Sequence, residues 1–487
     1  MKKSPEALND SIIFKSYGAV GGLVTGSCHI IEFKGSKIMV DGGLFQGRDE
    51  ERTEKGNSRN GEPTTKSVAR GVTQILVTHS HIDHMGILPL FIRQGFTPTI
   101  LTTEATRAFM EPMLNNSADI QKSEHRQDRL YDKHDVDKTI KHVRVVEPFK
   151  EIPIGHKRSG ITAEFLLNGH VTGSSSVVLR NPDGKKNILF TGDMGKPNQS
   201  LCGGYEDYVS QYPEFPINTL VVESTNFERE PVPFEEKRMN FLEAINKTWE
   251  GGGNPIFPTL SFHRTQEIME MLHNGQREGL IPTDCKIYID APLAMKLLET
   301  FKELGSNYLS SRYGNNPNFY ESEQSSLDRF TLRNVVIVKS HQESRLLDQT
   351  LANSPGKIIV IASGGMGGYG RAVNYLRGEF GRNPKNSVLL TCYQVAGTEG
   401  AALLSNGKVV CGSEGGAKVI KIEGFTSHIS GPRETFTFLE RFNLTDLQTV
   451  IITHGRDPAR EAMATEFKVR GYNANVILPK IGQEIEI

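Results

Sequence analysis

One short segment carries three histidines and an aspartate within six residues, and it constrains the fold more than any other feature. It reads Thr78-His79-Ser80-His81-Ile82-Asp83-His84-Met85-Gly86. The apolar run from Thr73 to Thr78 predicts a short buried strand directly before it. Imidazole nitrogens and carboxylate oxygens at this density are typical ligands of a divalent metal. In an extended turn His79 and His81 project to the same side, and Asp83 and His84 can then face a second metal.

Composition places the chain among ordinary globular proteins. Its 487 residues suggest about three domains' worth of chain, with 37% hydrophobic and 23% charged residues. No apolar stretch is long enough to span a membrane, and the N-terminus does not resemble a signal peptide, so we expect a cytoplasmic protein. The 56 basic and 57 acidic residues nearly cancel, which argues against bulk electrostatic binding of nucleic acid. The five cysteines are scattered and never spaced as C-x-x-C, which argues against a disulfide framework or a cysteine zinc site.

The hydrophobic pattern divides the chain into regions of different character. A β-hairpin is expected over 27–41, a polar surface loop over 47–71, and a charged segment over 115–145 that favours a solvated helical arm or, alternatively, a substrate-facing flap. After residue 187, strand and helix patterns alternate, which indicates βαβ units and parallel sheet. Strands are expected at 187–191, 219–223, 254–258, 286–290, 335–339, 357–362, 388–393, 418–423, 449–453 and 476–478, and helices at 85–94, 234–249, 264–272, 291–304, 432–441 and 460–469.

The spacing H-x-H-x-D-H after a strand resembles the metal motif of the metallo-β-lactamase fold. Three further segments resemble that family's other motifs: Val40 to Gly47 with Asp41, Asn168 to Ser174 with His170, and Phe190 to Gly195 with Asp193. The resemblance implies that Asp41 holds the metal ligands by hydrogen bonds, that His170 completes a first metal site, and that Asp193 bridges two metals.

The second half of the chain resembles the β-CASP branch of this family, which processes nucleic acids. The matching segments are Val221-Val222-Glu223-Ser224-Thr225, Pro258-Thr259 with Arg264 to Glu267, Tyr288 to Ala294, Ala362 to Met366, Tyr393 to Thr398, Phe425 to His428 and Ile452 to Gly455. Two positions depart from the family pattern. Ser430 stands where an acidic residue is common, and Asn226-Phe227 follows the E-S-T motif in place of Tyr-Gly.

The resemblance implies an α/β fold: a metallo-β-lactamase αββα sandwich with an inserted β-CASP α/β cap domain. The expected limits are 1–215 and 406–487 for the two parts of the sandwich domain and 216–405 for the cap. It further implies two Zn²⁺ ions per chain. The implied metal ligands are His79, His81 and His170 for one ion, Asp83, His84 and His454 for the other, and Asp193 between them.

The implied function is zinc-dependent hydrolysis of RNA phosphodiester bonds by a two-metal-activated hydroxide, with endonucleolytic cleavage expected and additional 5′-exonucleolytic cleavage left open. Catalytic roles fall to Asp41, Asp83, Glu223 and His428, with His428 and Glu223 assisting the leaving oxygen. RNA is favoured over DNA because the last motif keeps its histidine, His454. Substrate contacts are expected from Ser363, Gly364, Gly365 and Arg264, single-stranded RNA is the expected partner, and a homodimer is possible.

Other functions remain open at this stage. A dinuclear hydrolase of small esters or thioesters would use the same metals, although the long cap and the Glu223 and His428 pair argue against it. A non-catalytic scaffold of an RNA-processing complex would be expected to lack some ligands, whereas all seven are present. A di-iron redox protein would require a flavin domain, for which the sequence offers no candidate.

Overall fold

A computed structural model describes residues 11–487 except 50–65, 125–128, 158, 198, 200, 307–327, 355 and 410–414. The chain forms two compact units, one built from residues 1–230 and 427–487 and the other from the intervening chain. For the same inserted unit, the sequence analysis predicts limits of 216 and 405. No helix in the described ranges combines the length and apolar character needed to cross a bilayer. The described cysteines Cys28, Cys202, Cys285 and Cys392 are free and buried, and Cys411 lies outside the described residues.

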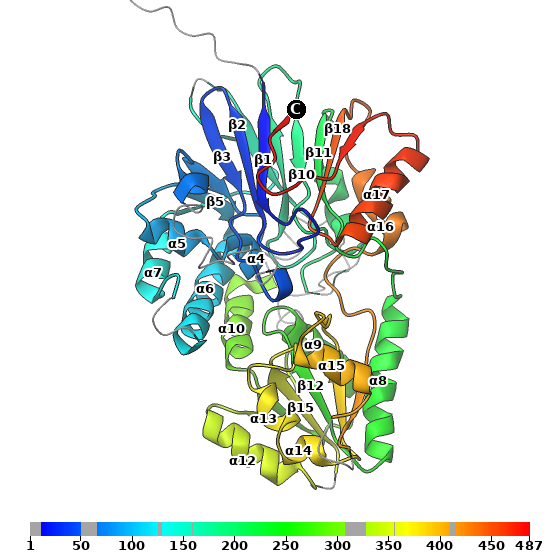
Figure 1. The fold of residues 1–487 in the computed structure, drawn as a ribbon. Coiled ribbons are helices and arrows are strands. Elements are labelled where there is room, and N and C mark those ends of the chain that lie inside the picture. Colours follow the sequence, from blue (N-terminus) through cyan, green and yellow to red (C-terminus); the bar gives the residue numbers. More distant parts are fainter. Residues whose placement is uncertain are drawn as a thin grey trace, which may run out of the picture. The chain divides into compact units, whose positions relative to one another are not determined.

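The first unit is built on two sheets, each with seven strands among the described residues (Figure 1). In spatial order, one sheet contains β20 (Ile485–Glu486), β1 (Ile13–Gly18), β2 (Cys28–Phe33), β3 (Ser36–Val40), β4 (Gln74–Leu76), β5 (Thr99–Thr103) and β6 (Val143–Val146). The other contains β19 (Asn475–Ile477), β18 (Thr449–Thr453), β11 (Thr219–Glu223), β10 (Ile188–Phe190), β9 (Ser175–Arg180), β8 (Thr162–Leu167) and β7 (Ile152–Pro153).

The core of this unit lies between the two sheets, because alternate residues of each strand point toward the facing sheet. In β2 the side chain of Ile31 joins this core, whereas that of Ile30 points to the helices on the outer face. Phe190 and Val221 of the second sheet fill the same inter-sheet layer. The predicted hairpin over 27–41 is present as β2 and β3, with a register from His29 opposite Val40 to Phe33 opposite Ser36.

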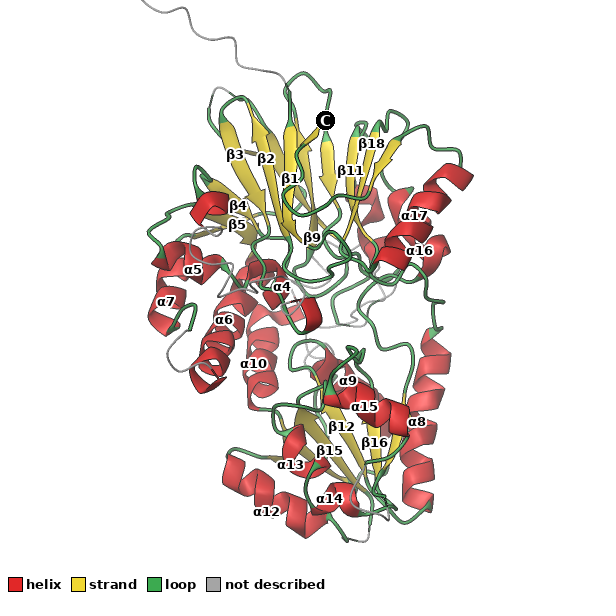
Figure 2. Cartoon of the chain, viewed as in Figure 1, coloured by secondary structure: helices red, strands yellow, loops and turns green. Residues whose placement is uncertain are grey.

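Helices cover the outer faces of both sheets, which gives the layers helix, sheet, sheet, helix (Figure 2). The first sheet is covered by α5 (Leu88–Arg93), α6 (Glu104–Glu124) and α7 (Lys133–Lys141), and α4 (Ile82–Met85) lies in the loop after β4. On the second sheet lie α16 (Gly431–Leu439) and α17 (Asp457–Val469), and the 3-10 helix η1 (Tyr205–Gln211) lies near β8.

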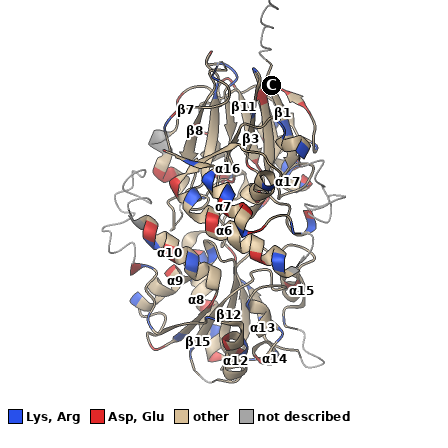
Figure 3. Cartoon of the chain, turned by 90° about the vertical axis from the view of Figure 1, so that its left-hand side faces the viewer, with Lys and Arg blue, Asp and Glu red and all other residues tan. Residues whose placement is uncertain are grey.

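The predicted solvated arm over 115–145 is instead part of this packed layer. Leu114 and Ala118 of α6 and Val136 of α7 are buried against the first sheet. Basic and acidic residues both occur along the two helices (Figure 3). The apolar residues scattered among the charged ones, such as Tyr131 and Val136, form the narrow stripe that anchors the helices.

The predicted surface loop over 47–71 is only partly described, since 50–65 lie outside the described residues. At its described ends most residues are exposed, as predicted, but three are buried. Asp49 is buried, and Val68 and Ala69 belong to the core beneath the first sheet.

The second unit is a doubly wound α/β structure whose sheet, among the described residues, has six parallel strands. Their spatial order is β14 (Val335–Ile337), β13 (Lys286–Asp290), β15 (Ile358–Ser363), β12 (Pro255–Thr259), β16 (Ser387–Leu390) and β17 (Lys418–Lys421). The helices are α8 (Phe234–Glu250), α9 (Arg264–Arg277), α10 (Pro292–Ser306), α12 (His341–Leu351), α13 (Ala372–Leu376), α14 (Glu379–Arg382) and α15 (Glu399–Asn406). The predicted alternation of strands and helices is therefore confirmed.

Candidate metal centre

All the residues proposed as metal ligands lie at one edge of the first unit. They occupy the loops that follow β4, β8, β10 and β18. Strands β10, β11 and β18 run parallel, so their carboxyl ends meet at the same edge. Residues more than 370 positions apart in the sequence are thereby brought together, as the contact between His84 and His454 demonstrates.

Four side chains form the first ligand set. The Nδ1 atom of His81 lies 3.0 Å from Nε2 of His79 and 3.3 Å from Nε2 of His170. One carboxylate oxygen of Asp193, Oδ2, lies 3.6 Å from Nε2 of His79 and 3.5 Å from Nε2 of His170. Three nitrogens and one oxygen thus converge on a single point.

A second ligand set lies on the other side of Asp193. Its members Asp83, His84 and His454 point one atom each toward a common centre. The Nε2 atoms of His84 and His454 are 3.1 Å apart, and His454 Nε2 is 3.6 Å from Oδ2 of Asp83. The remaining oxygen of Asp193, Oδ1, lies 3.2 Å from His84 Nε2 and 3.4 Å from His454 Nε2. Asp193 therefore presents one oxygen to each set.

The spacing of these atoms fits a bound metal. Ligand atoms about 2.0 to 2.1 Å from a tetrahedral metal are roughly 3.3 Å from one another. The first set has separations of 3.0 to 3.6 Å between its ligand atoms. The nitrogen and oxygen donors match the preferences of zinc and similar divalent cations. The cluster can hold a metal ion in each set.

Burial keeps the three histidines of the first ligand set in the neutral form, which is the form that binds a metal. It lowers the pKa of His81 to about 4 and holds the pKa values of His79 and His170 well below their usual value. A neutral imidazole has the free lone pair that a metal requires, so no proton has to leave these rings when an ion binds.

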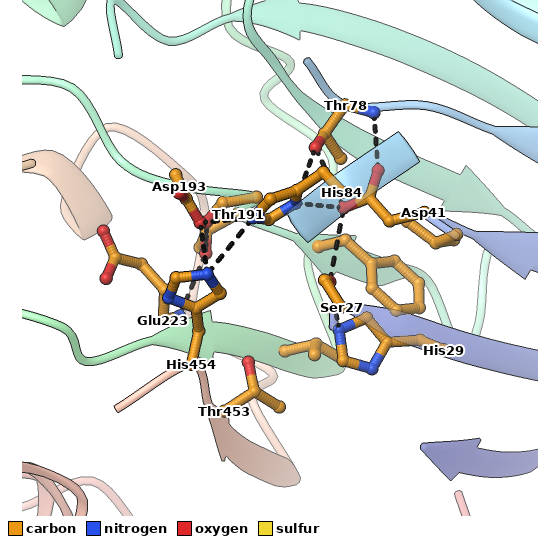
Figure 4. A pocket seen from close by; sticks show the side chains of 14 residues that line it. Ser27, His29, Asp41, Thr78, His84, Thr191, Asp193, Glu223, Thr453 and His454 are labelled. Atoms are coloured by element: carbon orange, nitrogen blue, oxygen red, sulfur yellow. Dashed lines mark hydrogen bonds and ion pairs between the residues drawn. The ribbon is translucent and has the colours of Figure 1, made fainter. Parts of the chain in front are cut away.

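Asp41 contacts Nδ1 of His84, on the opposite side of the ring from the Nε2 atom that faces the second ligand set (Figure 4). Its carboxylate lies 2.7 Å from Nδ1 of His84 and accepts hydrogen bonds from the backbone N–H and the hydroxyl of Thr78 at 2.8 and 2.9 Å. Asp41 has a left-handed backbone with φ of 60°, which is costly for a residue other than glycine and is often found at functional sites. Burial lowers the pKa of His84, but the charges of Asp193 and Asp41 outweigh it and raise that pKa well above its usual value.

Two orienting side chains within the motifs were not singled out from the sequence. The Thr225 hydroxyl lies 2.8 Å from Nδ1 of His454 and aims its Nε2 at the second set. Asn168 donates to the backbone oxygen of Asp193 at 2.9 Å and accepts from the backbone N–H of His170 at 3.3 Å. The available signal was their place in the motifs, since Asn168 stands two residues before His170 and Thr225 two residues after Glu223.

His428 lies beside the Asp193 carboxylate and is oriented by Glu223. Its Nδ1 is 2.9 Å from Oε1 of Glu223, and its Nε2 is 3.7 Å from Oδ2 of Asp193. Glu223 is itself fixed by the backbone N–H groups of Met194 at 3.0 Å and Thr225 at 2.8 Å. Burial lowers the pKa of His428, yet the two carboxylates raise it to about 9.

Neither departure from the family pattern disturbs this pair. Ser430 uses its backbone N–H to bond the Glu434 carboxylate at 3.0 Å, and His428 takes its orientation from Glu223. Phe227, which follows the E-S-T motif, is buried and packs against Phe436.

The predicted substrate-binding residues belong to the second unit. Ser363 ends β15 and begins a glycine-rich loop. Gly364 has φ of +117°, and a Cβ there would lie 2.0 Å from the backbone oxygen of Tyr369, so the turn requires glycine. Arg264 is buried, pairs with Glu267 and lies over the ring of Phe425.

Gly43 lies against the backbone of the loop that carries Asp83 and His84, and this close approach leads to a stability prediction. A Cβ at Gly43 would lie 1.7 Å from the backbone oxygen of Asp83. We expect Gly43→Ala to lower the free energy of unfolding by about 1 to 3 kcal/mol, measured by urea denaturation of metal-free protein. The matched control is Gly251→Ala, where the nearest atoms are 3.4 Å away and the change should stay within about 0.5 kcal/mol. Equal stability of both variants would contradict this prediction.

Comparison with known proteins agrees with this architecture. Residues 21–232 match the family model of the Metallo-beta-lactamase superfamily, and residues 265–403 match that of the Beta-Casp domain. The first unit, with its two sheets and the candidate metal ligands at one edge, has the metallo-β-lactamase fold. The chain belongs to the β-CASP family: it is a metallo-β-lactamase domain with an inserted Beta-Casp domain.

Curated relatives match along most of the chain. A ribonuclease of Thermus thermophilus is 26% identical over 477 residues, which cover 95% of this chain and 97% of that protein. A probable RNase of Methanocaldococcus jannaschii is 27% identical over 469 residues, with the same coverage of both chains. The transcription termination factor FttA of Pyrococcus abyssi is 30% identical over 402 residues, which cover 78% of this chain and 57% of that protein.

A solved structure shares the fold. It is a protein of unknown function from Enterococcus faecalis with a TM-score of 0.55 and 12% sequence identity, and the match covers 99% of this chain and all of that chain. At this identity the likeness concerns the fold alone.

Proposed function

We propose that this protein is a zinc-dependent ribonuclease that hydrolyses phosphodiester bonds of single-stranded RNA. The observation that carries the proposal is the position of Asp193, which presents Oδ2 to His79 and His170 and Oδ1 to His84 and His454 at 3.2 to 3.6 Å. A carboxylate shared in this way suits two metals held a few ångströms apart. The ribonuclease relatives, aligned over nearly their whole length, support RNA as the substrate.

Bound at these two sets, divalent cations supply a nucleophilic water at neutral pH and polarise the phosphate oxygens. The chain's own residues do the remaining work. The first and second sets fix the two positions, and Asp41 and Thr225 orient His84 and His454 through their Nδ1 atoms. Glu223 holds Nδ1 of His428 so that its Nε2 faces the centre, where a proton on Nε2 can be given to the leaving oxygen.

The glycine-rich loop at Ser363, Gly364 and Gly365 is our candidate for contacting a substrate phosphate. Its contribution must come from N–H groups other than that of Gly364, which bonds the backbone oxygen of Thr259 at 2.9 Å. Arg264 already pairs with Glu267, so a phosphate would have to compete with that carboxylate. The expected homodimer and cytoplasmic location stay predictions.

The test uses single-stranded RNA labelled at the 5′ end in one sample and at the 3′ end in another. Purified protein should produce internal fragments from both labels, and a released 5′ mononucleotide would add exonucleolytic cleavage. Removing metal with a chelator should lower the rate by about 10²-fold or more, and added Zn²⁺ should restore it. A protein that holds two Zn²⁺ ions and turns over a small ester, yet leaves RNA intact, would refute the proposal in favour of an ester hydrolase.

A further inference from the structure

Another buried histidine of the N-terminal region, His29, lies near the metal centre without being one of its ligands. It is 5% exposed and belongs to β2, on the face that points into the inter-sheet core. Its ring stacks on Phe14 at 5.7 Å and lies 6.0 Å from the ring of Phe190. A polar ring in an apolar layer is costly unless both of its nitrogens are hydrogen-bonded, and here they are.

Hydrogen bonds connect His29 to a ligand through two intermediate side chains (Figure 4). Nε2 of His29 is 3.2 Å from the Ser27 hydroxyl oxygen, which is 3.4 Å from Oδ2 of Asp41. The same carboxylate oxygen is 2.7 Å from Nδ1 of His84. On the far side, Nδ1 of His29 is 2.9 Å from the hydroxyl oxygen of Ser16. The chain therefore runs Ser16, His29, Ser27, Asp41, His84.

The connection from His29 to Asp41 requires one tautomer of His29, with the proton on Nε2. A carboxylate only accepts, so the Ser27 hydroxyl is the donor toward Asp41. The Ser27 oxygen then accepts from Nε2–H of His29, whose pKa is lowered to about 3 by burial, so that the ring is neutral. With Nε2 protonated, Nδ1 is an acceptor, so the single proton of the Ser16 hydroxyl points to Nδ1 of His29 at 2.9 Å and not to the backbone oxygen of Gly18, which lies 2.8 Å from the same hydroxyl oxygen.

The backbone of Ser27 holds the same region together. Its N–H donates to the backbone oxygen of Asp83 at 2.8 Å, and its carbonyl accepts from the N–H of Gly43 at 2.9 Å. Ser27 thus lies against the loops that carry Asp41 and Asp83. A shift of its side chain would be transmitted directly to both loops.

Packing alone does not fix the Asp41 carboxylate. A cavity of about 20 Å³, roughly the space of one water molecule, is lined by Ser27, His29, Asp41, His84 and neighbouring side chains. Because this space adjoins the carboxylate, Asp41 could rotate into it if a hydrogen bond were lost. The hydrogen bonds must therefore supply the directional control.

We infer that His29 is a positioning residue for the second ligand set: acting through Ser27, it fixes the Asp41 carboxylate and so aims Nε2 of His84 at the metal. The inference rests on the proposed two-metal function, because it assigns a role toward the second ion. Outer partners of metal ligands usually change metal affinity by 10- to 100-fold, and this partner acts from one layer further out. We expect an effect of about tenfold.

The experiment measures Zn²⁺ affinity, not activity. Metal-free wild type, Ser27→Ala, His29→Phe and the double variant are titrated with Zn²⁺ against a competing chromophoric chelator, which resolves the two binding steps. His29→Phe keeps a ring between Phe14 and Phe190, and Ser27→Ala removes a single oxygen atom. The matched control is Ser80→Ala, since Ser80 is buried in the ligand loop and its hydroxyl has no hydrogen-bond partner among the described residues.

We expect Ser27→Ala and His29→Phe each to weaken the second step about tenfold, with the first step and the Ser80→Ala control unchanged within about twofold. The double variant should bind like Ser27→Ala alone, because His29 acts only through Ser27. A wild type that fails to take up two ions would instead refute the proposed function. A wild type that binds two ions, together with a second step unchanged in Ser27→Ala, would overturn the inference. Independent, additive losses of Zn²⁺ affinity in the double variant would also overturn the inference. Equal weakening of both binding steps in His29→Phe, together with a lower melting temperature of its metal-free form, would overturn it as well.

Discussion

Asp193→Asn should remove most of the bound metal and nearly all RNA cleavage. The substitution keeps the shape of the side chain but removes the negative charge that faces both ligand sets, at 3.5 to 3.6 Å on one side and 3.2 to 3.4 Å on the other. An amide group offers one weaker oxygen ligand and a nitrogen that repels a cation. We expect less than one metal ion per chain and a loss of rate of roughly 10³-fold or more.

Metal content by mass spectrometry and initial rates on labelled RNA check this result. The matched control is Asp183→Asn, because Asp183 is exposed in the loop between β9 and β10 and bonds only a local backbone N–H among the described residues. That control should keep full metal and rate. A variant of Asp193 that retains two ions would show that the carboxylate does not bridge.

His428→Ala should lower the rate of RNA cleavage without loss of bound metal. The ring lies beside the bridging carboxylate, but His428 belongs to neither ligand set, so both ions should remain. Losing a positioned proton donor costs typically 10²- to 10⁴-fold in rate, and we expect a fall of that size. An exposed histidine of α7 provides the control, His134→Ala, which should cleave RNA like the wild type. Unchanged cleavage by His428→Ala would refute the role in leaving-group protonation.

The Glu223 carboxylate, which orients His428, gives an independent check on the role of His428. Glu223→Gln keeps the shape of the side chain but weakens its bond to Nδ1 of His428. If Glu223 acts through His428, the double variant with His428→Ala should be no slower than His428→Ala alone. Additive losses would assign Glu223 a separate function.

The metal centre was predictable because its ligands are dense in short segments. Asp83 and His84 stand in the same motif as two further histidines, and a strand end before them fixes their direction. The single histidines His170 and His454 gained meaning only from their order along the chain, as part of a family resemblance. The structure brings them to the same edge through strands that are distant in sequence.

Hydrogen bonds between distant segments could not be predicted in this way. Nothing in the spacing of Ser27 and His29 shows that they reach Asp41, because that contact depends on the register of β2 against β3 and on the left-handed turn at Asp41. Arg264 is an instructive opposite case. Its place in a family-like segment predicts a substrate contact, and the fold gives it in addition a partner from the same segment, Glu267, one helical turn away.

The order of the segments has a consequence for biosynthesis. The second ligand set needs His454, and β18, which carries it, pairs with β11 on the other side of an insertion of nearly two hundred residues. A chain still growing on the ribosome has six of the seven proposed ligands long before the last one, His454, emerges. The second ligand set can therefore be completed only when nearly the whole chain has been synthesised.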